Sequence, residues 1–104
     1  MIITTTDFVP DKKVRQILGI ARGNAIRSRG VGGHFVAGLE QMVGGEISSY
    51  LSVMNDAREE ALKRMTADAE KLGADAIINV RIVTSEIMMN AAEVVAYGTA
   101  VKLG

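Results

Sequence analysis

The sequence contains no cysteine and no tryptophan, and its 104 residues include one histidine, one proline, two Phe and two Tyr. Without cysteine there can be no disulfide, no thiolate nucleophile and no cysteine-ligated zinc or iron–sulfur site. So few aromatic rings leave little to stack on single-stranded nucleic acid. The 12 basic and 12 acidic side chains cancel, so the basic excess typical of a nucleic-acid-binding protein is missing as well. We expect no nucleic-acid partner.

Long apolar runs are also missing. No stretch approaches the roughly 20 apolar residues that a membrane-spanning helix needs. The first residues, MIITTTDFVPDKK, lack the basic start and the apolar core of a secretory signal peptide. We therefore expect a cytoplasmic protein with no membrane partner. The length predicts a single domain over residues 1–104, with a core built from aliphatic side chains, because 48% of the residues are hydrophobic and only 4% are aromatic.

The spacing of apolar residues predicts the order β-β-α-α-β-β. A short β-branched run, IITTT, opens the chain, and Gly44 and Gly45 are expected to end the first helix. Glu60 and Arg64 are expected to pair across one turn of the second helix, which is long and amphipathic. This order indicates an α+β domain with a mostly antiparallel sheet. The later elements are expected at residues 14–26 (strand), 34–43 (helix), 47–72 (helix), 74–85 (strand) and 92–103 (strand), with 85–90 connecting the last two.

The last predicted strand is apolar on both faces. One face carries Val94 and Ala96, and the other carries Val95, Tyr97 and Val101. An antiparallel sheet with one face in water should instead alternate between apolar and polar residues. We therefore predict a homo-oligomer, in which another copy of the chain covers the surplus apolar surface.

One stretch is rich in both arginine and glycine: RGNAIRSRGVGGHF, residues 22–35. Because it precedes a predicted helix, its N–H groups and arginines could hold an anion. The dinucleotide and P-loop motifs do not fit, since Phe35 stands where glycine is required and Leu39-Glu40 stand where Lys and Ser/Thr are required. The alternative is a tight turn whose arginines form ion pairs, and we favour it. The weak anion-site candidate comprises Arg27, Arg29, Gly33 and His34.

Candidates for catalysis are few. His34 has no nucleophile or carboxylate near it in sequence, whereas Glu46, Glu86 and Glu93 lie at the ends of predicted elements. A carboxylate and His34 could do acid–base chemistry only if folding or assembly brought them together. We assign no catalytic residue and no cofactor, and expect a non-enzymatic protein. The alternative is an enzyme whose site forms between subunits, from His34 with Glu46 or Glu86.

Metal binding has little support in the residues themselves. Met42, Met54 and Met65 fall on predicted apolar helix faces and are expected in the core, and Met88 and Met89 are adjacent. A tight site for a soft metal needs thiolates or several imidazoles. We predict no tight binding of Zn²⁺, Cd²⁺ or Cu⁺.

Six stretches follow one another along the chain: IITTT, GIARGNAIRSRGVGG, GGEISSY, AREEALKRM, LGADAIINVR and SEIMMNAAEVVAYGTAV. In this order they resemble the YbjQ-like family, whose members carry the description "putative heavy-metal-binding". The resemblance implies a dodecin-like α+β subunit and closed homo-oligomeric rings, notably pentamers. It implies no activity and transfers no ligand set, so the ligand, a small molecule or an ion, stays open, with heavy-metal binding as a further alternative. The chain departs from the family pattern at Asp11, where glycine is usual after the proline, and this alters at most the first turn.

Overall fold

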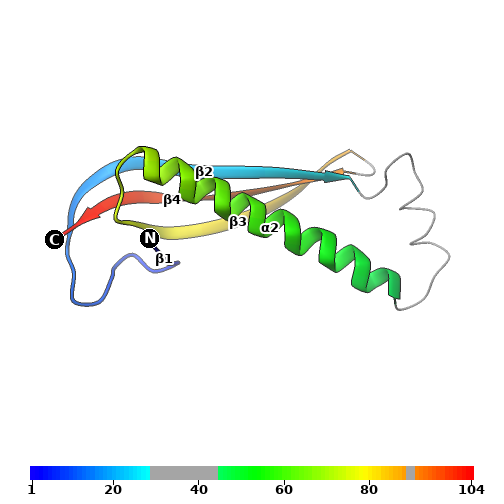
Figure 1. Cartoon of the computed structure of the whole chain (residues 1–104), viewed down its shortest axis with the longest axis horizontal. Coiled ribbons are helices and arrows are strands. Elements are labelled where there is room, and N and C mark those ends of the chain that lie inside the picture. The colour runs from blue at the N-terminus through cyan, green and yellow to red at the C-terminus, as the bar shows by residue number, and fades with distance from the viewer. Residues whose placement is uncertain (29–44, 89–90) are drawn as a thin grey trace.

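The computed structural model describes the backbone of residues 1–28, 45–88 and 91–104, and the side chains of 1–27, 51–86 and 91–104. The strands form one sheet in the order β1-β3-β4-β2, with α2 lying across it (Figure 1). β1 pairs with β3 in parallel, whereas the β3–β4 and β4–β2 pairs are antiparallel. The predicted α+β fold with a mostly antiparallel sheet is confirmed. The elements are β1 (Ile2–Ile3), β2 (Val14–Ser28), α2 (Gly45–Lys71), β3 (Ala76–Met88) and β4 (Ala91–Leu103).

The element boundaries follow the sequence pattern closely, with three differences. The opening strand is only two residues long. β3 continues to Met88 through much of the expected connection, because Ser85 and Glu86 pair with Glu93 and Ala92 of β4. Gly45, which was expected to end an earlier helix, is instead the first residue of α2. The predicted helix over residues 34–43 lies outside the described residues.

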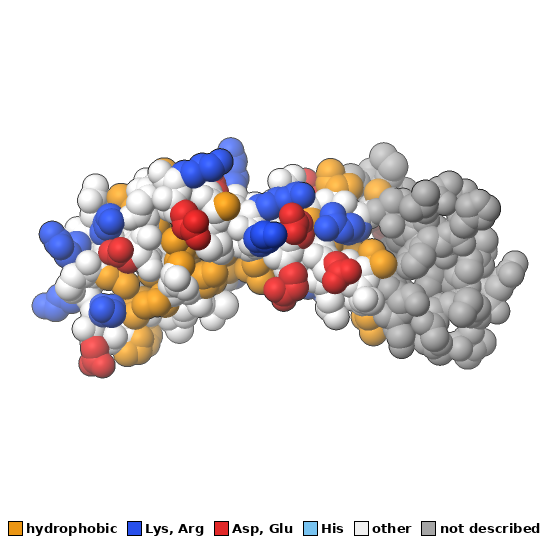
Figure 2. Space-filling view, viewed as in Figure 1, with side chains coloured by type: hydrophobic (Ala, Val, Ile, Leu, Met, Phe, Trp, Pro, Cys, Tyr) orange, Lys and Arg blue, Asp and Glu red, His pale blue; other side chains and the backbone are white. Residues whose placement is uncertain are grey.

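The helix α2 is long because its apolar stripe repeats without interruption. A glycine two residues after Lys71 terminates it. Gly73 adopts a φ of 77°, and the N–H of Ala74 donates to the carbonyl of Ala69 at 3.1 Å, which closes the helix terminus. The outward side of α2 carries charges of both signs (Figure 2). No helix in the described ranges is long and apolar enough to cross a membrane. The inward stripe is completely buried: Ala57, Ala61, Met65 and Ala69.

Helix and sheet approach closely along β2. The helix faces small residues there, Ala21, Gly23 and Ala25, all of them buried. A Cβ added at Gly23 would overlap the backbone of Met65 and Ala61 in α2. Only glycine fits at this position, and the close approach brings α2 directly over the β2 edge of the sheet. We call this contact between α2 and β2 the alanine seam.

The N-terminal segment covers part of the other face of the sheet. After β1, the N–H of Val80 donates to the carbonyl of Thr4 at 3.0 Å, and the N–H of Asn79 donates to that of Thr6 at 2.9 Å. Asn79 has a φ of 54° and lies at an irregularity in the β3–β4 register, which is typical of a bulge. The segment completes a second, small apolar cluster of Val9, Ala76, Ile78 and Val101.

The rest of that face carries no covering element among the described residues. Cross-strand pairing places Arg22 beside Tyr97 and Asn24 beside Val95, with Val83 of β3 paired to Val95 on its other side. Large apolar side chains on this face are strongly exposed, most of all Ile17 at 69% and Ile20 at 72%. We call it the open face, and its exposed apolar residues are Ile17, Ile20, Ile26, Val83 and Tyr97.

Candidate functional site

Side chains of α2 form hydrogen bonds with some of the main-chain groups along the outer edge of β2. The main-chain N–H of Arg22 donates to Oδ2 of Asp68 at 3.0 Å. Nη1 of Arg64 donates to the carbonyl oxygen of Asn24 at 2.6 Å, and its Nε lies 3.1 Å from Oε1 of Glu60. The predicted Glu60–Arg64 pair is therefore confirmed. It orients the same guanidinium that donates to the carbonyl of Asn24 on β2. These contacts occupy two hydrogen-bonding positions that an edge strand would otherwise offer to another strand.

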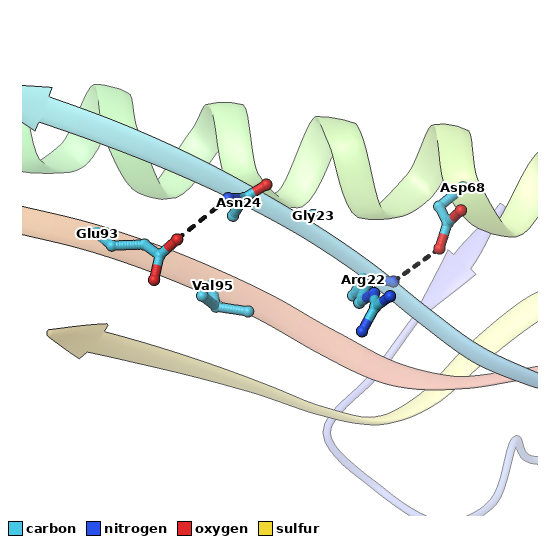
Figure 3. A pocket seen from close by; sticks show the side chains of 6 residues that line it. All are labelled: Arg22, Gly23, Asn24, Asp68, Glu93 and Val95. Atoms are coloured by element: carbon cyan, nitrogen blue, oxygen red, sulfur yellow. Dashed lines mark hydrogen bonds between the residues drawn. The ribbon is translucent and has the colours of Figure 1, made fainter.

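A groove of about 420 Å³ lies beside this edge. Residues from three elements line it, and Asn24 Nδ2 donates to Oε2 of Glu93 at 3.1 Å across the β2–β4 pair. Figure 3 shows Val95 between Glu93 on one side and Arg22 on the other. The groove thus has Val95 on its floor, with the carboxylate of Glu93 at one end. At the other end lies Arg22, whose own main-chain N–H binds the carboxylate of Asp68. Its lining residues are Arg22, Gly23 and Asn24 of β2, Asp68 of α2, and Glu93 and Val95 of β4.

The charged groups of the groove retain unused hydrogen-bonding capacity. Among the described residues, the guanidinium of Arg22 makes no hydrogen bond or ion pair. Asp68 and Glu93 each use one carboxylate oxygen, Oδ2 and Oε2, in the bonds above. Within the described ranges, the guanidinium of Arg22 and one oxygen each of Asp68 and Glu93 therefore have no partner.

A second hollow, of about 360 Å³, lies at the opposite end of the sheet. Basic side chains gather near the chain's C-terminal end in Figure 2, and Arg15 and Lys102 line the hollow. Lys102 Nζ lies 3.9 Å from Oδ1 of Asp75, whose Oδ2 accepts the N–H of Leu103 at 2.9 Å. Asp75 thus partly neutralises the basic charge, and this hollow is the weaker candidate for a ligand site.

The anion-site candidate is described at only one of its four residues. Arg27 lies near the end of β2, half-buried, and its Nη1 donates to the carbonyl of Ile26 at 3.1 Å. Arg29, Gly33 and His34 lie outside the described residues, so that anion site stays a prediction. Within the described ranges, neither Arg22 nor Arg27 forms the ion pair that a charged turn was expected to make.

The carboxylates considered for catalysis do not converge in the described part of the chain. Glu86 is exposed on β3 and does not line the groove, whereas Glu93 does. The side chains of Glu46 and His34 lie outside the described residues. Sequence reasoning missed Arg22, Asn24 and Asp68 as a group. The sequence gives one indication of this group. Polar Arg22 and Asn24 alternate with small Gly23 on β2, and this alternation places the two polar side chains on one face of the strand.

The described residues do not suit a soft heavy metal. Within residues 1–27, 51–86 and 91–104, no three His, Cys, Asp or Glu side chains lie close enough together to hold an ion. The groove offers two carboxylates next to a guanidinium, with neither sulfur nor imidazole among its lining residues. Soft metals select thiolate, thioether and imidazole ligands, so this donor set does not fit them.

A family model and individual relatives both match this chain over nearly its whole length. A family model described as "Putative heavy-metal-binding", YbjQ, matches residues 1–104. A UPF0145 protein of Archaeoglobus fulgidus is 54% identical over 103 residues, covering 99% of this chain and 95% of the relative. One from Methanosarcina acetivorans is 50% identical over 103 residues, covering 99% and 97%.

The fold itself has a counterpart among solved structures. A crystal structure of a protein of unknown function from Pediococcus pentosaceus, assigned to the DUF74 family, superposes with a TM-score of 0.68. The superposition covers 100% of this chain and 98% of the other at 17% identity, so it supports the fold alone. Because the family model spans all 104 residues and these relatives keep about half of their residues identical, this chain belongs to the YbjQ-like family of UPF0145 proteins.

Proposed function

We propose that the protein is a subunit of a ring-shaped homo-oligomer that binds a small ligand and catalyses no reaction. The observation that carries the proposal is the open face of the sheet, where Ile17 and Ile20 are 69% and 72% exposed. Single exposed apolar residues are normal, but several of them on one sheet face mark an interaction surface. A second copy of the chain is the occupant that the two-faced apolar strand β4 favours.

The two edges of the sheet differ, which favours a ring over a two-fold dimer. Outside the groove, β2 carries Arg15 and Arg27 and no acidic residue. Beyond the segment that β1 covers, residues 82–86 of β3 are all exposed, and Glu86 is the only charged residue among them. A contact between the β2 side of one copy and the β3 side of the next would match these charges. Contacts between two different surfaces generate a ring when the rotation closes, and the family resemblance points to five copies.

The contact at the middle of β2 would use side chains rather than a continuous sheet. Asp68 and Arg64 already occupy the outward N–H of Arg22 and the carbonyl of Asn24. A strand of a neighbouring copy could pair with β2 there only by displacing both. We therefore propose that neighbouring copies meet through the open face and through exposed β3 side chains, with α2 holding the β2 edge closed.

The binding role rests on the groove beside β2. Its two carboxylates, one amide and one guanidinium suit a small polar molecule better than a heavy metal. The family description also concerns binding and not catalysis. No observation on the described residues favours the alternative of an enzyme, because Glu86 lies outside the groove and Glu93 is engaged by Asn24.

The test of assembly is light scattering coupled to size exclusion, with native mass spectrometry, at micromolar concentration. We expect one discrete multimer, with five copies as the leading expectation. A monomer across this range would overturn the proposal. A multimer of two copies related by a two-fold axis would overturn the ring while leaving a self-contact in place.

A further inference from the structure

We infer that the groove beside β2 binds a small zwitterion of the α-amino-acid class, with a carboxylate at Arg22 and an ammonium group at Glu93. This inference rests on the proposed ligand-binding role and names the ligand class for it. Two features carry it: Arg22 and Glu93 lie on opposite sides of Val95 in the groove, and Glu93 is engaged by Asn24 instead of by Arg22.

The strands place these groups on one face. Arg22 and Asn24 are two residues apart on β2, and Glu93 and Val95 are two apart on β4, so each pair points to the same side of the sheet. Asn24 pairs directly with Val95 across the strands, and its amide holds Glu93 at 3.1 Å. The amide thereby anchors the carboxylate at the far side of Val95 from Arg22 (Figure 3).

The unused atoms define the chemistry of the ligand. A guanidinium presents two parallel N–H groups to a carboxylate, and Arg22 has no partner among the described residues. The second oxygen of Glu93 can accept from an ammonium group. Asp68 lies at the Arg22 end of the groove, where its Oδ2 already accepts the main-chain N–H of Arg22. Val95 is half-buried between Glu93 and Arg22 and offers apolar contact to a ligand side chain.

A ligand with one charge fits less well. An anion alone would satisfy Arg22 but leave the second oxygen of Glu93 without a donor, and a cation alone would satisfy Glu93 but leave the guanidinium of Arg22 without an acceptor. A molecule that carries both charges can satisfy both ends at once. The volume, about 420 Å³, lies in the usual range of small-molecule sites, roughly 300–1,000 Å³. The other hollow does not compete, since Lys102 there already faces Asp75.

The experiment is a titration followed by amide chemical shifts, using leucine, N-acetylleucine and leucinamide at up to millimolar concentration. Amidation removes the anion with almost no change in size, and acetylation removes the cation while adding an acetyl group. We expect a saturable response to leucine at Arg22, Gly23, Asn24 and Glu93. We expect each blocked analogue to bind at least about tenfold more weakly, because each loses one charge-assisted contact.

Two variants assign the two ends of the ligand. Arg22→Gln should weaken leucine and N-acetylleucine, and Glu93→Gln should weaken leucine and leucinamide, each by about tenfold or more. Glu93→Gln keeps an oxygen that can accept from Asn24. Arg15→Gln, which removes a cation from the same strand outside the groove, should leave binding unchanged.

Each contrary result overturns the inference. These results are the lack of a saturable local response to leucine, equal affinity for the blocked analogues, or unchanged binding in Arg22→Gln. Light scattering on the same samples shows whether the multimer is intact, so that a failure of leucine binding can be distinguished from a failure of assembly. A multimer that ignores leucine overturns the zwitterion site alone, whereas a monomer overturns the proposed assembly. If Arg22→Gln dissociates the multimer without changing leucine binding, Arg22 belongs to the subunit contact and the inference is wrong.

Discussion

The main-chain N–H of Arg22 and the carboxylate of Asp68 form a 3.0 Å hydrogen bond between residues 46 positions apart in sequence. The bond ties the middle of an edge strand to a side chain of the helix above it. Asp68→Ala leaves that N–H without its partner and should reduce the free energy of unfolding by about 0.5–1.5 kcal/mol. Urea denaturation at constant protein concentration measures the change.

The matched variant is Asp68→Asn, which retains an acceptor oxygen and should recover much of the loss. Glu70→Ala, a change at an exposed residue of the same helix, should have an effect within about 0.5 kcal/mol. Equal stabilities of Asp68→Ala and the unaltered protein would show that water replaces the carboxylate without cost.

Gly23→Ala tests the alanine seam. The added methyl group would overlap the backbone of Met65 and Ala61, so α2 has to move away from β2. Overpacking of this kind typically costs about 1–3 kcal/mol, and backbone overlap leads us to expect the upper end of that range or more. Thermal unfolding followed by circular dichroism measures it. Asn24→Ala, on the opposite face of the same strand, adds nothing against the helix and should be much milder, and comparable losses in the two would contradict the seam.

Two charge insertions separate folding from assembly. Val101 is fully buried whereas Ile20 is 72% exposed. Val101→Asp buries an unpaired charge and should cost several kcal/mol, enough to prevent folding. Ile20→Asp should leave circular dichroism unchanged but shift the light-scattering mass toward the monomer, and Ile20→Val should preserve the multimer. A folded Ile20→Asp multimer of unchanged mass would place the subunit contact elsewhere.

Metal binding is tested on chelator-treated protein by calorimetry. The sequence has no cysteine and a single histidine, and the described groove presents carboxylates beside a guanidinium. We expect no binding of Zn²⁺, Cd²⁺ or Cu⁺ tighter than about 1 μM, which corresponds to roughly −8 kcal/mol. A tighter site with fixed stoichiometry, lost in His34→Ala, would contradict this expectation and support the family description.

Asp11 occupies the left-handed region with a φ of 63°, at the position where the family resemblance leads one to expect glycine. Asp tolerates this conformation better than most residues, but a β-branched side chain does not. Asp11→Val should therefore be about 1–2 kcal/mol less stable than Asp11→Gly. Chemical denaturation of the two variants gives the difference, and the reverse order would show that the turn rearranges.

The sequence predicted the long elements well, because each has a sustained period. α2 was expected at 47–72 and spans Gly45–Lys71, and β4 was expected at 92–103 and spans Ala91–Leu103. The parallel pairing of β1 with β3 could not be predicted, because only Ile2 and Ile3 take part and no local period encodes a partner more than 70 residues away.

The groove was harder to predict than the elements that build it. Glu93 drew notice as a carboxylate at the end of an element, but its bond to Asn24 depends on the register of β2 against β4. In the sequence, Asp68 is one of many charged residues of α2 and has no feature that distinguishes it. Its role follows from how closely the helix approaches β2, and that distance is determined by the missing side chain of Gly23.

The alanine seam also restricts how this sequence can vary. Any side chain enlarged on β2 would need a smaller one opposite, yet the facing helix positions are already mostly alanine. Only glycine is smaller, and within a helix it costs about 1 kcal/mol relative to alanine. Few pairs of compensating substitutions are therefore tolerated along the alanine seam, because the glycine needed in α2 to make room would destabilise that helix. Exposed positions of α2 that make no hydrogen bond to β2, such as Glu70, carry no such reciprocal restriction, so changes there can accumulate one at a time.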